Sequence, residues 1–232
     1  MRRFVDIDLG CEPVSDETTV CKFRYLFEAH YLGDELFALT NEYLQESGLK
    51  VSTGTIVDAT IIDAPGSTKN KEGKRDPKKH QTREGNRWYF GMKGHSGVDS
   101  QTKLIHSVTA TAANVHDSQL LGDLLHDDET RVWGDSAHAG QGDTIRENAP
   151  GAKDFTNNKG SRNRSLSDKE KTSNKPKSKV RAKAEHPFWI LKRIFGFNKV
   201  CYRGLDKNAN RLFIAGGLVN LYMARRQLLR PT

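Results

Sequence analysis

Three carboxylates lie inside or at the ends of otherwise apolar segments: Asp58, Asp135 and Glu185. Asp58 stands between Val57 and Ala59 in a β-branched run. A charge in such surroundings costs free energy unless a partner stabilises it. Carboxylate oxygens that converge from rigid elements can hold two divalent ions about 3.5–4 Å apart, the arrangement that serves phosphoryl transfer. The three acids are therefore candidate metal ligands.

Each acid also has a plainer interpretation. Asp58 is either an outward residue of a half-exposed strand or an inward one, and Ile56 on the same face favours the inward interpretation. Asp135 ends the segment 132–134, where functional groups gather in open α/β sheets, but it equally suits a helix cap. For Asp135 both interpretations stay open.

Glu185 has basic residues at helical spacing on either side. Arg181 precedes it by four residues and Lys192 follows Arg181 by eleven, so a continuous helix places all three on one face. Pro187 complicates this expectation, because a proline inside a helix costs about 3 kcal/mol or more. Either the helix begins close to Glu185, which removes Arg181 from the face, or it kinks there.

Other chemistries find little support. The chain has no GxxxxGK phosphate loop, HExxH motif or GxSxG elbow. His138 follows Asp135 closely, but without cysteine or further histidine ligands at metal spacing a zinc site is not expected. The three cysteines, Cys11, Cys21 and Cys201, lack zinc spacing and follow no export signal, which indicates free thiols in the cytoplasm.

The elements that must position these residues follow from hydrophobic periodicity. Helical spacing covers the first fifty residues, with a break at Gly33, and predicts a helical hairpin more than a helix-turn-helix. Strands are expected at 55–63, 88–95, 104–112, 131–135 and 154–156, with a long loop at 65–87. Helices are expected at 117–125, at 144–148, around 188–195 and at 209–229, the last one buried.

This order of elements is that of the ribonuclease-H-like fold. We therefore predict an α/β protein with a mixed five-stranded sheet flanked by helices. Residues 1–50 form a short N-terminal helical segment, and residues 51–232 form the catalytic domain.

The basic excess of the chain is concentrated in one segment. The formal net charge is +8, and residues 153–183 carry eleven basic and three acidic side chains, which alone give +8. Such a basic stripe suits a polyanion, although a solvated, partly disordered loop would have the same composition.

Four segments carry a family resemblance: TIVDAT at 55–60, GNRWYFGMK at 85–93, WGDSA at 133–137 and RAKAEHPF at 181–188. They resemble bacterial insertion-sequence transposases of the DDE type, in particular the insertion-sequence-five group. The resemblance runs from about Asp16 to Arg226. It implies that Asp58, Asp135 and Glu185 form an acidic triad that holds two Mg²⁺ ions, for which Mn²⁺ can substitute.

The resemblance also implies roles for basic residues. Arg181 and Lys192 match the basic positions of the family's late signature and would clamp phosphate oxygens, and Lys177, Lys179 and Lys183 would follow the DNA backbone with the rest of the basic stripe. Two positions depart from the family pattern. Ser178 replaces a tyrosine of that signature, and His138 replaces a tyrosine near Asp135.

The implied function is Mg²⁺-dependent cleavage of double-stranded DNA at the terminal inverted repeats of an insertion sequence, followed by strand transfer into target DNA. The resemblance further implies a homodimer in the DNA complex and a cytoplasmic, nucleoid-associated location, with no membrane as a partner. Members of the group carry a further helical stretch before the position of Asp16, so a truncated, catalytically inactive DNA-binding fragment that regulates an intact copy is the alternative. Trp88 and Trp189 are expected to be buried, with stacking on an extruded base as their functional alternative.

Overall fold

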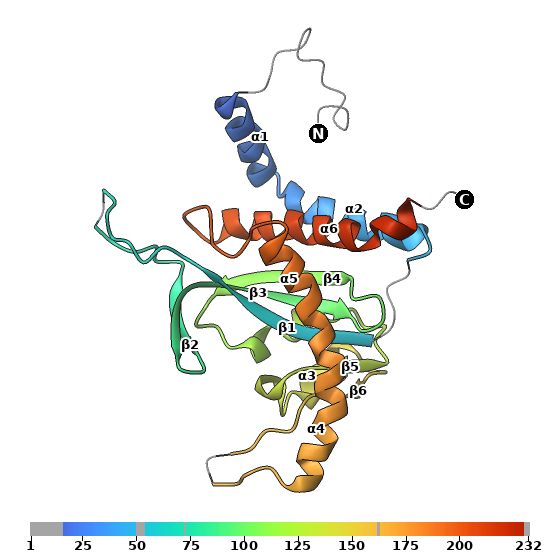
Figure 1. Ribbon diagram of the computed structural model, residues 1–232. Coiled ribbons are helices and arrows are strands. Elements are labelled where there is room, and N and C mark those ends of the chain that lie inside the picture. Colours follow the sequence, from blue (N-terminus) through green and yellow to red (C-terminus); the bar gives the residue numbers. More distant parts are fainter. Residues whose placement is uncertain (1–15, 50–53, 72, 162, 230–232) are drawn as a thin grey trace.

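The computed structural model describes residues 16–49, 54–71, 73–161 and 163–229. Its centre is one mixed sheet of six strands (Figure 1), namely β1 (Gly54–Asp63), β2 (His80–Glu84), β3 (Arg87–Asp99), β4 (Ile105–Ala112), β5 (Arg131–Trp133) and β6 (Lys153–Asp154). Strands β1, β3 and β4 form an antiparallel meander, and β5 and β6 continue the sheet in parallel from β1. The order β4-β3-β1-β5-β6 is consistent with the expected ribonuclease-H-like fold.

The expected number of five strands is wrong, because β2 is a sixth. It lies in the segment that the sequence predicts as a loop, and it pairs with residues 87–91 of β3 across a two-residue turn at Gly85, where φ is 58°. Four of its five residues are exposed, so the strand has no apolar alternation that periodicity could detect. The turn residues Gly85 and Asn86 were its available signal.

Six α-helices lie around the sheet in the described part of the chain: α1 (Glu17–Ala29), α2 (Leu32–Glu46), α3 (Gly142–Asn148), α4 (Asp168–Arg181), α5 (Glu185–Arg193) and α6 (Asp206–Leu228). A 3₁₀ turn at Ala182–Ala184 joins α4 to α5, so that the two form one long rod across a face of the sheet (Figure 1). The helix expected at 117–125 is instead two 3₁₀ turns, Asp117–Leu120 and Gly122–Leu124.

Apolar side chains cover both faces of the sheet. Ile56 and Ile62 belong to the larger core, which α5 and α6 complete with residues such as Leu191 and Val219. The intervening Val57 belongs to a second core on the other face, with the 3₁₀ turns and α3. Because side chains alternate along a strand, even-numbered residues of β1 face α5 and odd-numbered ones face α3.

The N-terminal helices form the expected hairpin, but the break is not at Gly33. The chain turns at Tyr31, where φ is 53°, and Gly33 lies inside the first turn of α2. Its backbone N–H donates to Asn210 Oδ1 of α6, and a Cβ at this position would overlap the Asn210 side chain. Phe37 of α2 is buried against α6, so α2 packs on the helix that covers β4 and is not presented as a recognition helix.

Within the described part of the chain, Cys21 and Cys201 are free thiols. Cys11 lies outside the described residues. None of the helices among the described residues combines the length and the apolar character that a membrane span requires.

Candidate active site

The site lies where β1 and β5 part. Within β1, strand β5 pairs only with Gly54–Ile56, so this edge of β1 has no strand partner among the described residues from Val57 to Ile62, before Asp63 forms a parallel bridge with Lys199. Asp58 is the second residue of this open stretch. It shares its face with Ile56 and Ile62 and points towards the rod of α4 and α5, with 17% of its side chain exposed. The inward interpretation of Asp58 is therefore correct.

Residues of the rod meet Asp58 across a cleft. Asp58, Arg181, Glu185 and Lys192 all line this cleft, whose volume is about 360 Å³. Asp135 lines a neighbouring cleft of about 440 Å³, and Lys192 lines both. The structure thus places two of the three acids in one cleft and the third in the adjoining one.

The rod of α4 and α5 brings Arg181, Glu185 and Lys192 to one cleft, as their helical spacing predicts, despite Pro187. This proline lies in the first turn of α5, where a missing backbone N–H breaks little helical hydrogen bonding, and the 3₁₀ turn before it keeps α4 in line. Arg181 remains on the face of Glu185, and its Nη1 lies 3.4 Å from both carboxylate oxygens of Asp58.

The electrostatics couple the two aspartates. Burial and, to a lesser degree, the negative charge of Asp135 raise the pKa of Asp58 to about 6, against the opposing effects of Arg181, the Ala59 N–H and His138. For Asp135, burial also acts upward, but the hydrogen bond and charge of His138, with the Ala137 N–H and Arg181, outweigh it and lower the pKa. Of the two aspartates, Asp58 is thus the one whose negative charge is less well compensated.

Asp135 is also the cap that its position suggested. Its Oδ1 accepts from the backbone N–H of Ala137 at 2.8 Å and lies 2.9 Å from Nδ1 of the buried His138. With 38% of its side chain exposed, Asp135 is oriented by these contacts and still reaches the cleft. The histidine at position 138 therefore fixes the carboxylate that it neighbours.

Residues 168–181 of the basic stripe form a helix, where the composition also allowed a disordered loop. Helix α4 begins with a capping box between Ser167 and Glu170. Ser178 Oγ accepts a hydrogen bond from Asn157 at 3.0 Å, and Lys177 Nζ donates to the Thr156 carbonyl. These contacts fasten α4 to the loop after β6.

The other candidate DNA contacts differ in their exposure. Lys183 Nζ donates to the carbonyl of Ser100 at 2.7 Å, whereas Lys175 and Lys179 are exposed one turn apart on α4. Arg162, a further member of the stripe, lies outside the described residues. The outer face of α4 is therefore open to a ligand, as are Lys153, Lys159 and Arg164 in the part of the stripe before it.

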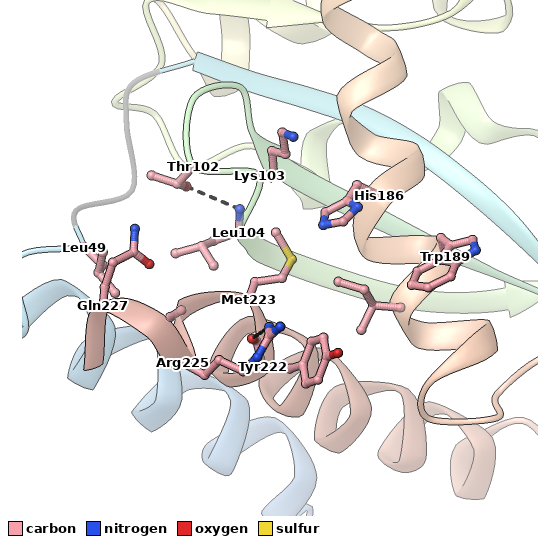
Figure 2. Close-up of a pocket in the computed structure, with 12 residues that line it drawn as sticks. Leu49, Thr102, Lys103, Leu104, His186, Trp189, Tyr222, Met223, Arg225 and Gln227 are labelled. Atoms are coloured by element: carbon pink, nitrogen blue, oxygen red, sulfur yellow. Dashed lines mark hydrogen bonds between the residues drawn. The ribbon is translucent and has the colours of Figure 1, made fainter. Parts of the chain in front are cut away.

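Trp88 and Trp189 are not buried, which corrects the expectation. They are 66% and 54% exposed, and Trp189 lines the cleft of Asp58. Trp189 also borders a cavity of about 420 Å³ between α5, the end of α6 and the turn before β4 (Figure 2). No carboxylate of the described residues lines that cavity, so it has none of the ligands expected at a Mg²⁺ site.

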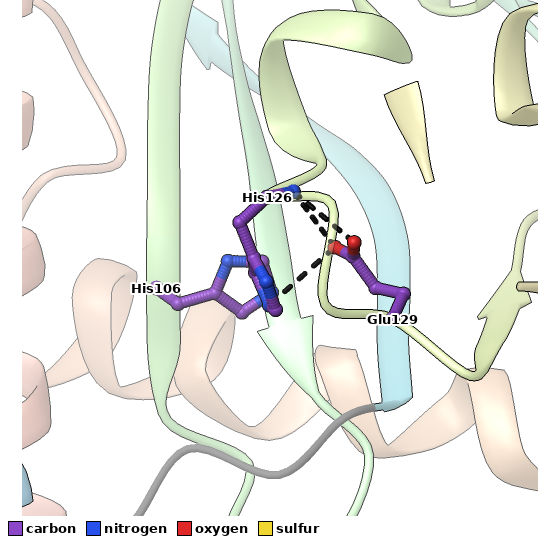
Figure 3. Close-up of side chains that lie close together, drawn as sticks. All are labelled: His106, His126 and Glu129. Carbon is purple, nitrogen blue, oxygen red and sulfur yellow. Dashed lines mark hydrogen bonds and ion pairs between the residues drawn. The ribbon is translucent and has the colours of Figure 1, made fainter. Parts of the chain in front are cut away.

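A second set of titratable side chains comes from β4 and from the segment before β5. His106, His126 and Glu129 each offer a ligand atom, and these atoms lie within 4.8 Å of one another (Figure 3). No motif in the sequence indicates this group, since its two histidines are twenty residues apart.

Residues 50–221 match the family described as "Transposase DDE domain". The chain belongs to the DDE transposase family. No solved structure matches it. Members of this family generally use divalent metals, and a transposase domain implies DNA as a partner. The family assignment thus agrees with the fold and gives the acid-lined clefts of this DDE transposase a chemical context.

Proposed function

We propose that this DDE transposase cleaves DNA at the ends of an insertion sequence and joins the freed ends to target DNA, with Mg²⁺ as cofactor. The observation that supports this best is the convergence of Asp58, Arg181, Glu185 and Lys192 on one cleft, with Asp135 in the next. The four matching segments favour a member of the insertion-sequence-five group.

The chemistry of the donor set fits Mg²⁺. The candidate ligands are carboxylate oxygens, which hard divalent cations prefer, and the raised pKa of Asp58 marks a negative charge that a cation would stabilise. Asp58, Asp135 and Glu185 would hold two Mg²⁺ ions, with Mn²⁺ as a substitute. When bound, the ions supply an activated oxygen nucleophile and neutralise charge on the leaving oxygen.

The remaining residues bind and orient the substrate. Lys192 borders both clefts and can hold a phosphate oxygen between them. Arg181 is within reach of Asp58 and would exchange this partner for a phosphate when a cation takes over the carboxylate. His138 keeps Asp135 in one orientation. Trp189, exposed at the rim, offers a ring face on which a displaced base can stack.

The exposed lysines of α4 would follow the DNA backbone. We expect the double variant Lys175→Gln/Lys179→Gln to bind duplex DNA more weakly, and the slope of log affinity against log salt to become shallower by about 2, since each lost phosphate contact contributes about 0.9. Fluorescence anisotropy at several salt concentrations measures this. Lys22→Gln, an exposed lysine of α1, is the control. An unchanged slope would remove α4 from the DNA interface.

The function itself is tested by a strand-transfer assay with purified protein, supercoiled plasmid and oligonucleotides that end in free 3′-hydroxyls. We expect joined products with Mg²⁺ or Mn²⁺, and none from Asp135→Ala. Hydrolysis without joining would indicate a nuclease. DNA binding without any product would favour the alternative of an inactive fragment that regulates an intact copy.

The active form is proposed to be a homodimer on DNA in the cytoplasm, associated with the nucleoid. Exposed apolar side chains on the N-terminal helices support a protein partner: Val20, Phe23, Leu26, Leu36 and Leu39. Helix α1 buries none of its residues within the described chain.

A further inference from the structure

The group of His106, His126 and Glu129 lies apart from the acid-lined clefts. Thr55, which contacts both His106 and Glu129, is an odd-numbered residue of β1 and faces the side opposite to Asp58. Asp58 lies three positions after Thr55, which corresponds to about 10 Å along the strand. The group therefore occupies the other face of the sheet, at the edge where β1, β4 and β5 begin.

A β-bulge aims His106 into this position. Val98 pairs with Ile105 and Gly97 with Ser107, so His106 is the extra residue of β4. Its ring lies across β3 at Gly97, where a Cβ would stand 2.5 Å from His106 Cε1 and 2.6 Å from the carbonyl oxygen of Leu124. Only a residue without a side chain leaves room for this crossing.

Glu129 is a buried carboxylate with little compensating charge. None of its side chain is exposed, and its one ion-pair contact among the described residues is Nε2 of His126, 3.4 Å from Oε1. It accepts hydrogen bonds from Thr55 Oγ1 and from the backbone N–H of His126. A buried charge without a full cation is costly, which makes the site receptive to one.

Both imidazoles offer a nitrogen to the same point. Nε2 of His126 is buried and has no hydrogen-bond partner among the described residues. Burial, and to a lesser degree the charge of His126, lowers the pKa of His106 to about 3, so that this ring is neutral at pH 7. Ser107 Oγ lies 2.8 Å from His106 Nδ1 and can accept a hydrogen bond from its N–H. Nε2, which lies 3.1 Å from Thr55 Oγ1, would then exchange this contact for a metal ion.

We propose that His106 Nε2, His126 Nε2 and Glu129 Oε1 bind one Zn²⁺ or similar borderline transition-metal ion that fastens the start of β4 to the segment before β5. Ligands bound at about 2.0–2.1 Å in a tetrahedron stand about 3.3 Å apart, close to the 3.4 Å between His126 Nε2 and Glu129 Oε1. Two imidazoles and one carboxylate favour such an ion over Mg²⁺. A water molecule would complete the tetrahedron as the fourth ligand.

The test uses the full chain, stripped of metal with a chelator and dialysed. Titration calorimetry with ZnCl₂ should detect a site whose affinity for Zn²⁺ falls by about 100-fold or more in His126→Gln and in His106→Gln. Loss of a residue that only contacts a metal ligand already lowers metal affinity by about 10–100-fold. His80→Gln, an exposed histidine of β2, should bind as the unmodified protein does. A saturating excess of Zn²⁺ should raise Tm by about 5 °C or more.

Two further arms keep this site distinct from the acid-lined clefts. Asp58→Asn should keep the Zn²⁺ site, and Mg²⁺ should not compete for it at millimolar concentration. Zn²⁺ binding that is lost in Asp58→Asn but retained in His126→Gln would overturn the proposal and assign the ion to the cleft. Absence of saturable Zn²⁺ binding to the unmodified protein would also overturn it.

Discussion

The variant Asp58→Asn is expected to lose about 10³-fold or more of the DNA cleavage rate while it keeps its affinity for DNA. The amide has the shape of the carboxylate but lacks its charge, and transition-state stabilisation by metal ions is worth several kcal/mol, with tenfold in rate for each 1.36 kcal/mol. A gel assay of plasmid cleavage and an anisotropy titration measure the two properties. Asp123→Asn, an exposed carboxylate remote from the cleft, is the control.

The same substitution should stabilise the protein in the absence of metal. The pKa of Asp58 is about 6 in the folded chain against 3.8 for the free side chain, because of burial and the neighbouring Asp135. Between these values the folded state holds a proton that the unfolded state has lost, so folding stability falls as pH rises from below 3.8 to above 6. The difference corresponds to about 3 kcal/mol at pH 8, a loss that the uncharged amide variant does not suffer.

Urea unfolding of both proteins in chelator, at pH 8 and at pH 4, measures this effect. The variant should be the more stable protein at pH 8, and the gap should close as pH falls towards 4. Added Mg²⁺ should stabilise the unmodified protein more than the variant. A variant that is less stable at pH 8 and also inactive would point to a folding defect, and would contradict the role given to the Asp58 charge.

Residues of this site could be anticipated because their signals are local. The face of Asp58 follows from Ile56 two residues away, and the common face of Arg181, Glu185 and Lys192 follows from helical spacing. Their placement around one cleft agrees with these arguments, while their catalytic roles stay predictions. The order of strands was anticipated for the same reason, since β1, β3 and β4 each carry apolar or β-branched runs.

Other features depend on contacts between distant segments. The polar strand β2 exists because it pairs with residues 87–91, and His106 reaches Glu129 only because a bulge and Gly97 allow its ring across β3. Trp189 was expected inside because large aromatic residues usually contribute to cores, but α5 turns it towards the cleft. Apart from the turn residues Gly85 and Asn86 that follow β2, these placements have no signature within their own stretch of sequence.

Asn220 shows how a single polar residue in an apolar helix can carry a tertiary contact. It interrupts the apolar run 212–224 of α6 and is fully buried. Its Oδ1 accepts from the backbone N–H of Ile105 at 2.8 Å, and its Nδ2 donates to the Ile105 carbonyl at 2.7 Å and to Asn41 Oδ1 at 2.8 Å. The side-chain amide thus forms hydrogen bonds with the backbone at the start of β4, as a neighbouring strand would.

Replacement of Asn220 by Leu is therefore expected to cost about 3 kcal/mol or more, although leucine has a similar volume and the surroundings are apolar. Two buried backbone groups of Ile105 would lose their partner, at about 1–3 kcal/mol each. For a chain of this size the loss corresponds to a fall in Tm of about 10 °C. Thermal and urea unfolding measure it, and hydrogen exchange at the Ile105 amide locates it.

The matched control is Asn41→Ala, which removes the bond to Asn220 and a long contact of 3.5 Å with the His106 carbonyl but leaves both bonds between Asn220 and Ile105. It should cost about 1 kcal/mol and leave exchange at Ile105 slow. Equal losses in the two variants would mean that the link between α2 and α6 matters more than the edge of β4. A larger loss in Asn220→Leu, with fast exchange confined to the start of β4, would establish that α6 stabilises the sheet edge from which His106 projects.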